Sequence, residues 1–189
     1  MDKLRLRLMH KCAIERLADA ELLFESDPQK DRRYDSDYLL KLLGLELLLK
    51  FILEIETTEN SKNYSHYYDK LFVKLPQSAQ TRFLDLCGKH IGPSELSTSH
   101  IKIFKELGEN FIALRYPYER YKGKDERQYR ALSDNWLSNG ASLQEAAFRY
   151  HPEELTGLLY AAQVIVNEHA LRLELDSVVN ELFCVRGRL

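Results

Sequence analysis

The sequence predicts an all-α fold, and three features support this prediction. Apolar residues recur in steps of three and four through several long segments, which is the spacing of one face of an α-helix. Strand-like alternation is confined to residues 4–8, and no second run of this kind could pair with it. Residues typical of helix boundaries, such as Pro76 and the capping-box sequence Ser142 to Glu145, fall between the periodic segments.

The apolar spacing also gives an expected order of helices. We expect helices over residues 4–24, 38–56, 64–75, 77–90 and 101–118, the last of which Pro117 should kink or end. A partly helical and exposed stretch should follow over 121–139, with further helices from residue 142 and from residue 152 onward. The helix over residues 38–56 is apolar nearly all round, so it should lie at the centre of the bundle. The predicted architecture is one domain over residues 1–189, with a core over about 1–119 packed against C-terminal helices in 142–185.

Composition and charge narrow the functional classes. The chain has 189 residues, of which 44% are hydrophobic and 30% are charged, an ordinary balance for one ordered globular domain. Its formal net charge of -2 lacks the overall basic signature of many nucleic-acid-binding proteins. A nucleic-acid site would therefore have to be a local patch.

The location of the protein is inferred from its N-terminus, its apolar stretches and its cysteines. Residues 1–16 are charged and lack the apolar core of a secretion signal. The most apolar stretch, residues 38–55, is interrupted by four charged residues, which disfavours a membrane span. The three cysteines, Cys12, Cys87 and Cys184, are odd in number and widely spaced, as expected for reduced and buried thiols. We therefore expect a cytoplasmic protein that makes no membrane contact.

Charges inside the central helix are spaced to pair with one another. Glu46 and Lys50 are four residues apart, as are Lys50 and Glu54, so both pairs would share one stripe of the helix. A structural ion pair is the favoured interpretation, because an unpaired buried charge would be costly. A functional role is the alternative.

Three short motifs follow in a fixed order along these helices. They are Leu45-Glu46-Leu47-Leu48-Leu49-Lys50, then His66-Tyr67-Tyr68-Asp69-Lys70-Leu71-Phe72 with Leu75-Pro76, and Asn110-Phe111 with Arg115-Tyr116-Pro117-Tyr118-Glu119. In this order and in an all-helical setting, the segment over about residues 38–119 resembles bacterial proteins of the HEPN superfamily. The resemblance implies a bundle of four or five helices, frequent homodimerisation, and links to RNA cleavage, toxin–antitoxin modules or defence.

The resemblance also implies a catalytic pattern from which this chain departs. Ribonucleases of the superfamily use an arginine followed after four to six residues by a histidine. Arg115 is followed at those positions by Arg120, Tyr121 and Lys122, so the expected histidine is missing. Catalysis would then be lost or would use other residues.

The candidate catalytic residues are Arg115, His66 and Glu119. RNA cleavage without a metal ion needs a base, an acid and a cation that binds the phosphate. Arg115 could bind the phosphate through a bidentate contact, and His66 or Glu119 could exchange protons if the fold brings them together. In the alternative interpretation, His66 bonds a backbone group and Arg115 pairs with Glu119, four residues on.

A tyrosine-rich and basic stretch runs from Arg115 to Arg130. Cations can bind phosphates while aromatic rings stack on unpaired bases, so this stretch is the best local candidate for RNA contact. Its proposed nucleic-acid-binding residues are Tyr116, Tyr118, Arg120, Lys122, Lys124, Arg127 and Arg130. A solvated helix face is the competing interpretation.

No cofactor or metal ion is predicted. Cys87 and His90 could provide two metal ligands on adjacent turns, but no second pair with suitable spacing is present. The sequence also lacks a glycine-rich phosphate loop and the usual hydrolase motifs.

Three functional hypotheses follow. The first is a HEPN-like interaction module that binds a partner protein or RNA, as a homodimer and without an intact ribonuclease motif. The second is an RNA endonuclease that uses Arg115 with His66 or Glu119 and needs no metal. The third is a structural protein that assembles through the helical face from Leu155 to Phe183.

Overall fold

The computed structural model describes residues 2–26, 34–57, 66–91, 99–142, 146 and 148–172. These residues form seven α-helices and one short 3-10 helix, and none of them lies in a strand. The elements are α1 (Lys3–Ser26), α2 (Tyr34–Thr57), α3 (Tyr68–Val73), α4 (Gln77–His90), α5 (His100–Arg115), η2 (Pro117–Tyr121), α6 (Glu126–Ser138) and α7 (Pro152–Arg172). The all-α prediction is confirmed.

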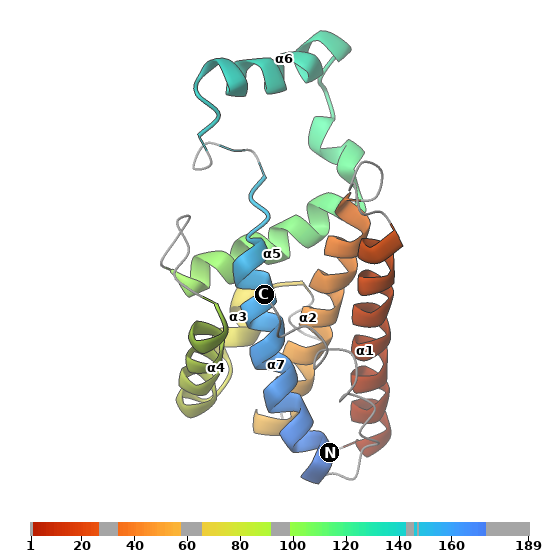
Figure 1. Ribbon diagram of the computed structural model, residues 1–189, viewed down its shortest axis with the longest axis vertical. Coiled ribbons are helices and arrows are strands. Elements are labelled where there is room, and N and C mark those ends of the chain that lie inside the picture. The colour runs from red at the N-terminus through yellow and green to blue at the C-terminus, as the bar shows by residue number, and fades with distance from the viewer. Residues whose placement is uncertain are drawn as a thin grey trace.

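The helix α2 lies at the centre of the bundle, as its sequence predicts. It runs beside α1 in the opposite direction, and α7 packs against both α2 and α4 (Figure 1). Seven of its apolar side chains are fully inaccessible to solvent, namely Leu42, Leu45, Leu48, Leu49, Phe51, Ile52 and Leu53. Burial of a leucine-sized side chain contributes about 2 kcal/mol, so this helix anchors the core. None of the described helices combines the length and apolarity that crossing a bilayer requires.

The apolar face of α7 is part of this core. Its residues Leu155, Leu158, Leu159, Ala162, Ile165 and Val166 are all buried within the chain. The prediction that this face serves assembly is therefore wrong for residues 155–172, because α2 and α4 already cover it. Residues 173–183 of the predicted face lie outside the described part of the chain.

The chain leaves the bundle after α5. Pro117 cannot continue the helix, and α5 ends at Arg115 before the 3-10 helix η2. A capping box then starts α6, in which the Asp125 side chain accepts from the Gln128 backbone and the Gln128 side chain accepts from the Asp125 backbone. Figure 1 shows α6 standing away from the bundle, so the expected exposed and partly helical stretch is confirmed.

The return from α6 differs from the sequence-based expectation. Ser142 was expected to begin a helix, but residues 142, 146 and 148–150 are not helical. Gly140 and Ala141 both have positive φ, which ends α6, and the Trp136 indole N–H donates to the Ser142 carbonyl at 2.9 Å. Residues 143–145 and 147 lie outside the described part of the chain, and the described residues on either side of them do not continue a helix.

Polar contacts fasten the returning chain to α5. Glu106 accepts from the Arg149 guanidinium at 2.8 Å and contacts His151 Nε2 at 2.5 Å. Asn110 donates to the Arg149 carbonyl at 2.6 Å, and the Tyr38 hydroxyl donates to the Tyr150 carbonyl. Burial raises the pKa of the Tyr38 phenol far above its usual range, so this donor stays protonated. Residues 148–151 are therefore fixed at one place on the bundle.

The described cysteines differ in their environments. Cys87 is buried and free, and burial, with the nearby Glu154 charge, raises the pKa of its thiol to about 11. Cys12 is exposed, so the expectation that all the cysteines are buried is wrong for this residue. Cys184 lies outside the described residues.

A close backbone contact sets the position of His66. Gly108 of α5 lies against the segment before α3, and a Cβ atom at Gly108 would lie 2.5 Å from the His66 carbonyl oxygen. Real Cβ atoms do not approach a backbone oxygen this closely, so the residue at 108 must be glycine for α5 and His66 to keep this separation.

We predict that Gly108→Ala lowers the free energy of unfolding by about 1–3 kcal/mol, because the added methyl group forces the two backbones apart. The matched control is Gly88→Ala on α4, where a Cβ atom would meet nothing within 4 Å. That change should stabilise the chain by about 0.5–1 kcal/mol through helix propensity. Urea denaturation followed by circular dichroism measures both, and equal effects would contradict the close contact.

Candidate functional site

Three residues from distant parts of the chain meet at one edge of the bundle. Glu46 lies in the middle of α2, His66 precedes α3, and Arg115 is the last residue of α5. His66 Nδ1 is 2.6 Å from Glu46 Oε2, and His66 Nε2 is 3.4 Å from Arg115 Nη1. The structure therefore brings together two of the three candidate catalytic residues and adds a buried carboxylate.

Glu46 is almost completely buried, with 3% of its surface exposed. Its other oxygen accepts from the Lys50 ammonium group at 2.6 Å, which confirms the predicted pair between these residues. Glu54, the other predicted partner of Lys50, accepts from the Arg5 guanidinium of α1 at 2.7 Å. A buried carboxylate is stable only when several groups bond it, and Lys50 and His66 together provide these bonds for Glu46.

The contacts of His66 define its tautomer. A carboxylate can only accept, so His66 Nδ1 donates its proton to Glu46. A guanidinium can only donate, so the contact with Arg115 is favourable when Nε2 carries no proton. The two contacts together fit the tautomer that has its proton on Nδ1 and its lone pair on Nε2, directed towards the arginine.

Aromatic rings hold the histidine and the arginine in place. The Phe111 ring centroid is 4.7 Å from that of His66, and the Arg115 guanidinium lies 5.6 Å from the Phe111 centroid and 5.2 Å from that of Tyr116. Arg115 Nη2 also donates to the Tyr116 hydroxyl at 3.2 Å. These contacts restrict the long arginine side chain although it is exposed.

Solvent exposure increases from Glu46 through His66 to Arg115. The Glu46 side chain is 4% exposed, the His66 side chain is 28% exposed, and Arg115 belongs to the exposed residues. The fully buried Tyr68 hydroxyl donates to the Leu42 carbonyl of α2, and burial raises the pKa of this phenol well above its usual value. The formal charges of Glu46, Lys50 and Arg115 sum to one net positive charge, which favours an anion at the open end of the cluster.

This arrangement can transfer protons beside a bound anion. A neutral imidazole whose other nitrogen is held by a carboxylate is a general base with a fixed orientation. A neighbouring guanidinium binds a phosphate or another oxyanion through two parallel N–H groups. The two groups suited to these functions, the His66 imidazole and the Arg115 guanidinium, are 3.4 Å apart.

The structure corrects the alternative interpretation of these residues. His66 was expected to bond a backbone group, but its Nδ1 bonds the Glu46 carboxylate. Arg115 was expected to pair with Glu119, but Glu119 forms its ion pair with Lys122 at 3.7 Å. Pro117 accounts for this difference, since η2 replaces the α-helix that would have placed residues 115 and 119 one turn apart.

The third candidate, Glu119, lies next to this cluster in a separate pocket. The pocket has a volume of about 490 Å³ and is lined by Tyr116, Glu119, Asn110 and Phe148, among others. Tyr116 contacts both the pocket and Arg115. The described contacts of Glu119 include neither His66 nor Arg115.

The predicted nucleic-acid-binding residues continue from this edge onto α6. All of those whose side chains are described are exposed, namely Tyr116, Tyr118, Lys122, Lys124, Arg127 and Arg130. The Arg120 side chain lies outside the described part of the structure. Arg130 pairs with Glu126 at 2.5 Å, but both are more than 70% exposed, so this pair adds little stability. The patch is therefore accessible to a ligand.

Sequence reasoning missed the link between Glu46 and His66. Glu46 was interpreted as the partner of Lys50 alone, although a carboxylate with two oxygens can accept from both. The available signal was its position in a helix that is apolar nearly all round. The described residues contain no group of three or more histidine, cysteine or acidic side chains that could hold a metal ion.

Comparison of the chain with family models, curated proteins and solved structures gives no significant match. The similarity to the HEPN superfamily consequently remains a prediction from the sequence motifs. The described residues therefore form an all-α bundle with a cluster of Glu46, His66 and Arg115 at one edge, whose groups could exchange a proton beside a bound anion.

We predict a coupling energy of about 1–3 kcal/mol between Glu46 and His66, because removal of either residue leaves the other poorly paired. A double-mutant cycle with Glu46→Ala and His66→Ala, measured by urea denaturation, gives this value. The control cycle uses Lys105 and Glu109, an exposed pair at 3.8 Å, for which we expect about 0.5 kcal/mol or less. Additive effects at Glu46 and His66 would contradict the proposed contact.

Proposed function

We propose that the chain is an RNA-cleaving module and that the Glu46–His66–Arg115 cluster is its catalytic site. The observation that supports this proposal most strongly is the contact between a carboxylate-oriented imidazole and an exposed guanidinium. In this proposal the base and the cation both come from the protein, so the reaction needs no metal ion.

The proposed reaction is attack of a ribose 2′-oxygen on the adjacent phosphorus. His66 Nε2 accepts the proton of the 2′-hydroxyl, and Glu46 stabilises the imidazolium that forms. Arg115 binds the phosphate oxygens and stabilises the charge that develops on them. The bond from phosphorus to the 5′-oxygen breaks, that oxygen takes a proton, and the products are a 2′,3′-cyclic phosphate and a 5′-hydroxyl end. Glu119 is the candidate for the acid; it supplies this proton only from its protonated form, so its ion pair with Lys122 must be released when the substrate binds.

The exposed tyrosines and basic residues beyond Arg115 support RNA as the substrate. Phosphate contacts from Lys122 and Lys124 would position the backbone, and Tyr118 offers an exposed ring for base stacking. Because η2 directly follows Arg115, an RNA strand bound there would pass the cluster.

We predict that the purified chain cleaves single-stranded RNA in the presence of EDTA and leaves 2′,3′-cyclic phosphate ends. His66→Ala should reduce the rate by about 10²–10⁴-fold through loss of the base. Arg115→Ala should reduce it by about 10²–10³-fold through loss of charge stabilisation. Gel analysis of a labelled oligonucleotide, with mass spectrometry of its ends, measures the rates and products.

The matched control is His100→Ala, which removes an exposed histidine at the start of α5 and should leave the rate unchanged. Glu119→Gln tests the acid, and a rate equal to that of the unaltered chain would remove Glu119 from the mechanism. No cleavage of any RNA by the unaltered chain would reject the enzymatic proposal. So would cleavage by the His66→Ala and Arg115→Ala variants at the rate of the unaltered chain.

A second candidate function is an interaction module that binds a partner protein or forms a homodimer. The observation that favours it is α6, which carries the exposed apolar residues Tyr129, Leu132 and Leu137 and has no buried residue. An amphipathic helix of this kind is stabilised when its apolar face is covered. A mass in solution that stays that of a monomer over a wide concentration range would disfavour the homodimer.

A further inference from the structure

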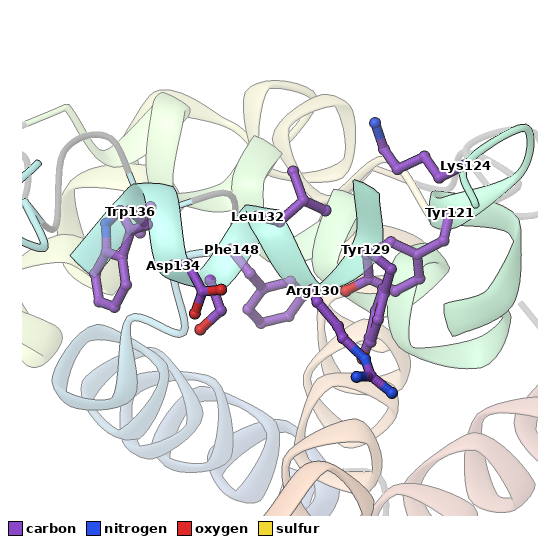
Figure 2. A pocket seen from close by; sticks show the side chains of 10 residues that line it. Tyr121, Lys124, Tyr129, Arg130, Leu132, Asp134, Trp136 and Phe148 are labelled. Carbon is purple, nitrogen blue, oxygen red and sulfur yellow. The ribbon is translucent and has the colours of Figure 1, made fainter. Parts of the chain in front are cut away.

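Aromatic side chains gather around a pocket beneath α6. The pocket has a volume of about 890 Å³, within the range of sites that bind small organic ligands. We call it the arm pocket and define it by six of its lining residues, Tyr121, Lys124, Tyr129, Arg130, Trp136 and Phe148. Figure 2 shows that the rings come from η2, from α6 and from the chain that returns to the bundle.

The rings of the arm pocket are held by their surroundings. Tyr121 and Tyr129 meet edge to face, with centroids 4.8 Å apart and an interplanar angle of 89°. The Trp136 indole is tied to the Ser142 carbonyl through its N–H group. Phe148 packs against Tyr150, with ring centroids 4.4 Å apart. Such pre-positioned rings lose little conformational entropy when a planar ligand stacks on them.

The polar lining residues suit a nucleotide. Lys124 and Arg130 supply positive charge for a phosphate, and the Asp134 carboxylate can accept from the amino group of a base. The described lining thus combines flat apolar faces, two cations, a carboxylate and several hydroxyl groups. An aliphatic segment of a protein would use the apolar surface but would offer no complementary group to Lys124 or Asp134.

One residue is shared between the arm pocket and the smaller pocket beside the catalytic cluster. Phe148 lines both the arm pocket and the 490 Å³ pocket that contains Tyr116. Tyr116 in turn accepts a hydrogen bond from Arg115 at 3.2 Å. A polymer with a phosphate at Arg115 could therefore extend through the smaller pocket and place a base in the arm pocket.

We propose that the arm pocket binds an unpaired nucleobase of single-stranded RNA, at a position in the strand beyond the phosphate bound by Arg115. This inference rests on RNA as the substrate class of the proposed function, but it does not depend on the cleavage step. A base can enter only when it is unpaired, because stacking on the rings competes with stacking in a duplex.

The sole tryptophan of the sequence provides a direct test, because Trp136 lines the pocket. Its fluorescence is followed while the full chain is titrated with 2′-O-methyl RNA, a single strand that cannot undergo attack by its own 2′-oxygen. We expect quenching that saturates with the single strand, weaker quenching with the matching duplex, and none with tripolyphosphate, which has charge but no base.

Substitutions of one exposed residue distinguish stacking from general apolar contact. Tyr129→Leu keeps an apolar side chain but loses the ring, so the affinity for the single strand should fall about tenfold. Tyr129→Phe keeps the ring and should bind within about twofold of the unaltered chain. Leu137→Ala, an exposed α6 residue outside the pocket lining, is the matched control and should leave affinity unchanged.

The outcomes separate this inference from the catalytic proposal. Quenching without cleavage would reject the catalytic proposal and keep the base-binding pocket, whereas cleavage without quenching would do the reverse. Failure of the oligonucleotide to bind, or equal loss of affinity in the Tyr129→Phe and Tyr129→Leu variants, would overturn the inference. So would emission that changes with protein concentration but not with oligonucleotide, since a second copy of the chain would then occupy the pocket.

Discussion

A carboxylate buried among leucines must be stabilised from several directions, and the arrangement around Glu46 meets this requirement. Lys50 provides one partner from the next turn of α2, and His66 provides the other from a segment twenty residues away. Loss of one partner from a buried ion pair costs about 3–5 kcal/mol, comparable with the total stability of a domain. The position of His66 is therefore coupled to the packing of the core, and its second nitrogen is left facing the solvent side, where Arg115 lies.

The end of α5 connects this buried network to the exposed part of the molecule. Phe111 and Arg115 contact His66 from the last turns of the helix, and Pro117 then turns the chain towards α6. Glu106 of α5 binds Arg149 and His151 in the chain that returns from α6. The helix α5 therefore contacts the chain both before and after α6. In the proposed function, proton transfer, anion binding and base stacking would thus follow one another from the core outward, as solvent exposure increases.

Much of the fold could be predicted from the sequence, because helical periodicity and proline positions are local signals. The central position of α2, the end of α5 near Pro117 and the exposed α6 are examples.

The start of a helix at Ser142 was predicted wrongly, because the Trp136 contact and the positive φ of Ala141 are tertiary and conformational features. The sequence named His66 and Arg115 as candidates but could not show whether the fold brings them together. The role of Glu46 as the partner of His66 likewise depends on a contact between distant segments. Phe148 was not recognised because its role depends on where the returning chain crosses α6.

The central claim is that Glu46 fixes His66 as the neutral tautomer with its proton on Nδ1. Nitrogen-15 NMR of the histidine side chains tests this most directly, with the signal among the six histidines assigned by comparison with His66→Ala. At neutral pH we expect the His66 Nδ1 resonance to show a bonded proton and the Nε2 resonance to show a free lone pair, and Glu46→Ala should abolish this preference. A proton on Nε2 in the unaltered chain, or a tautomer that does not respond to loss of Glu46, would contradict the account.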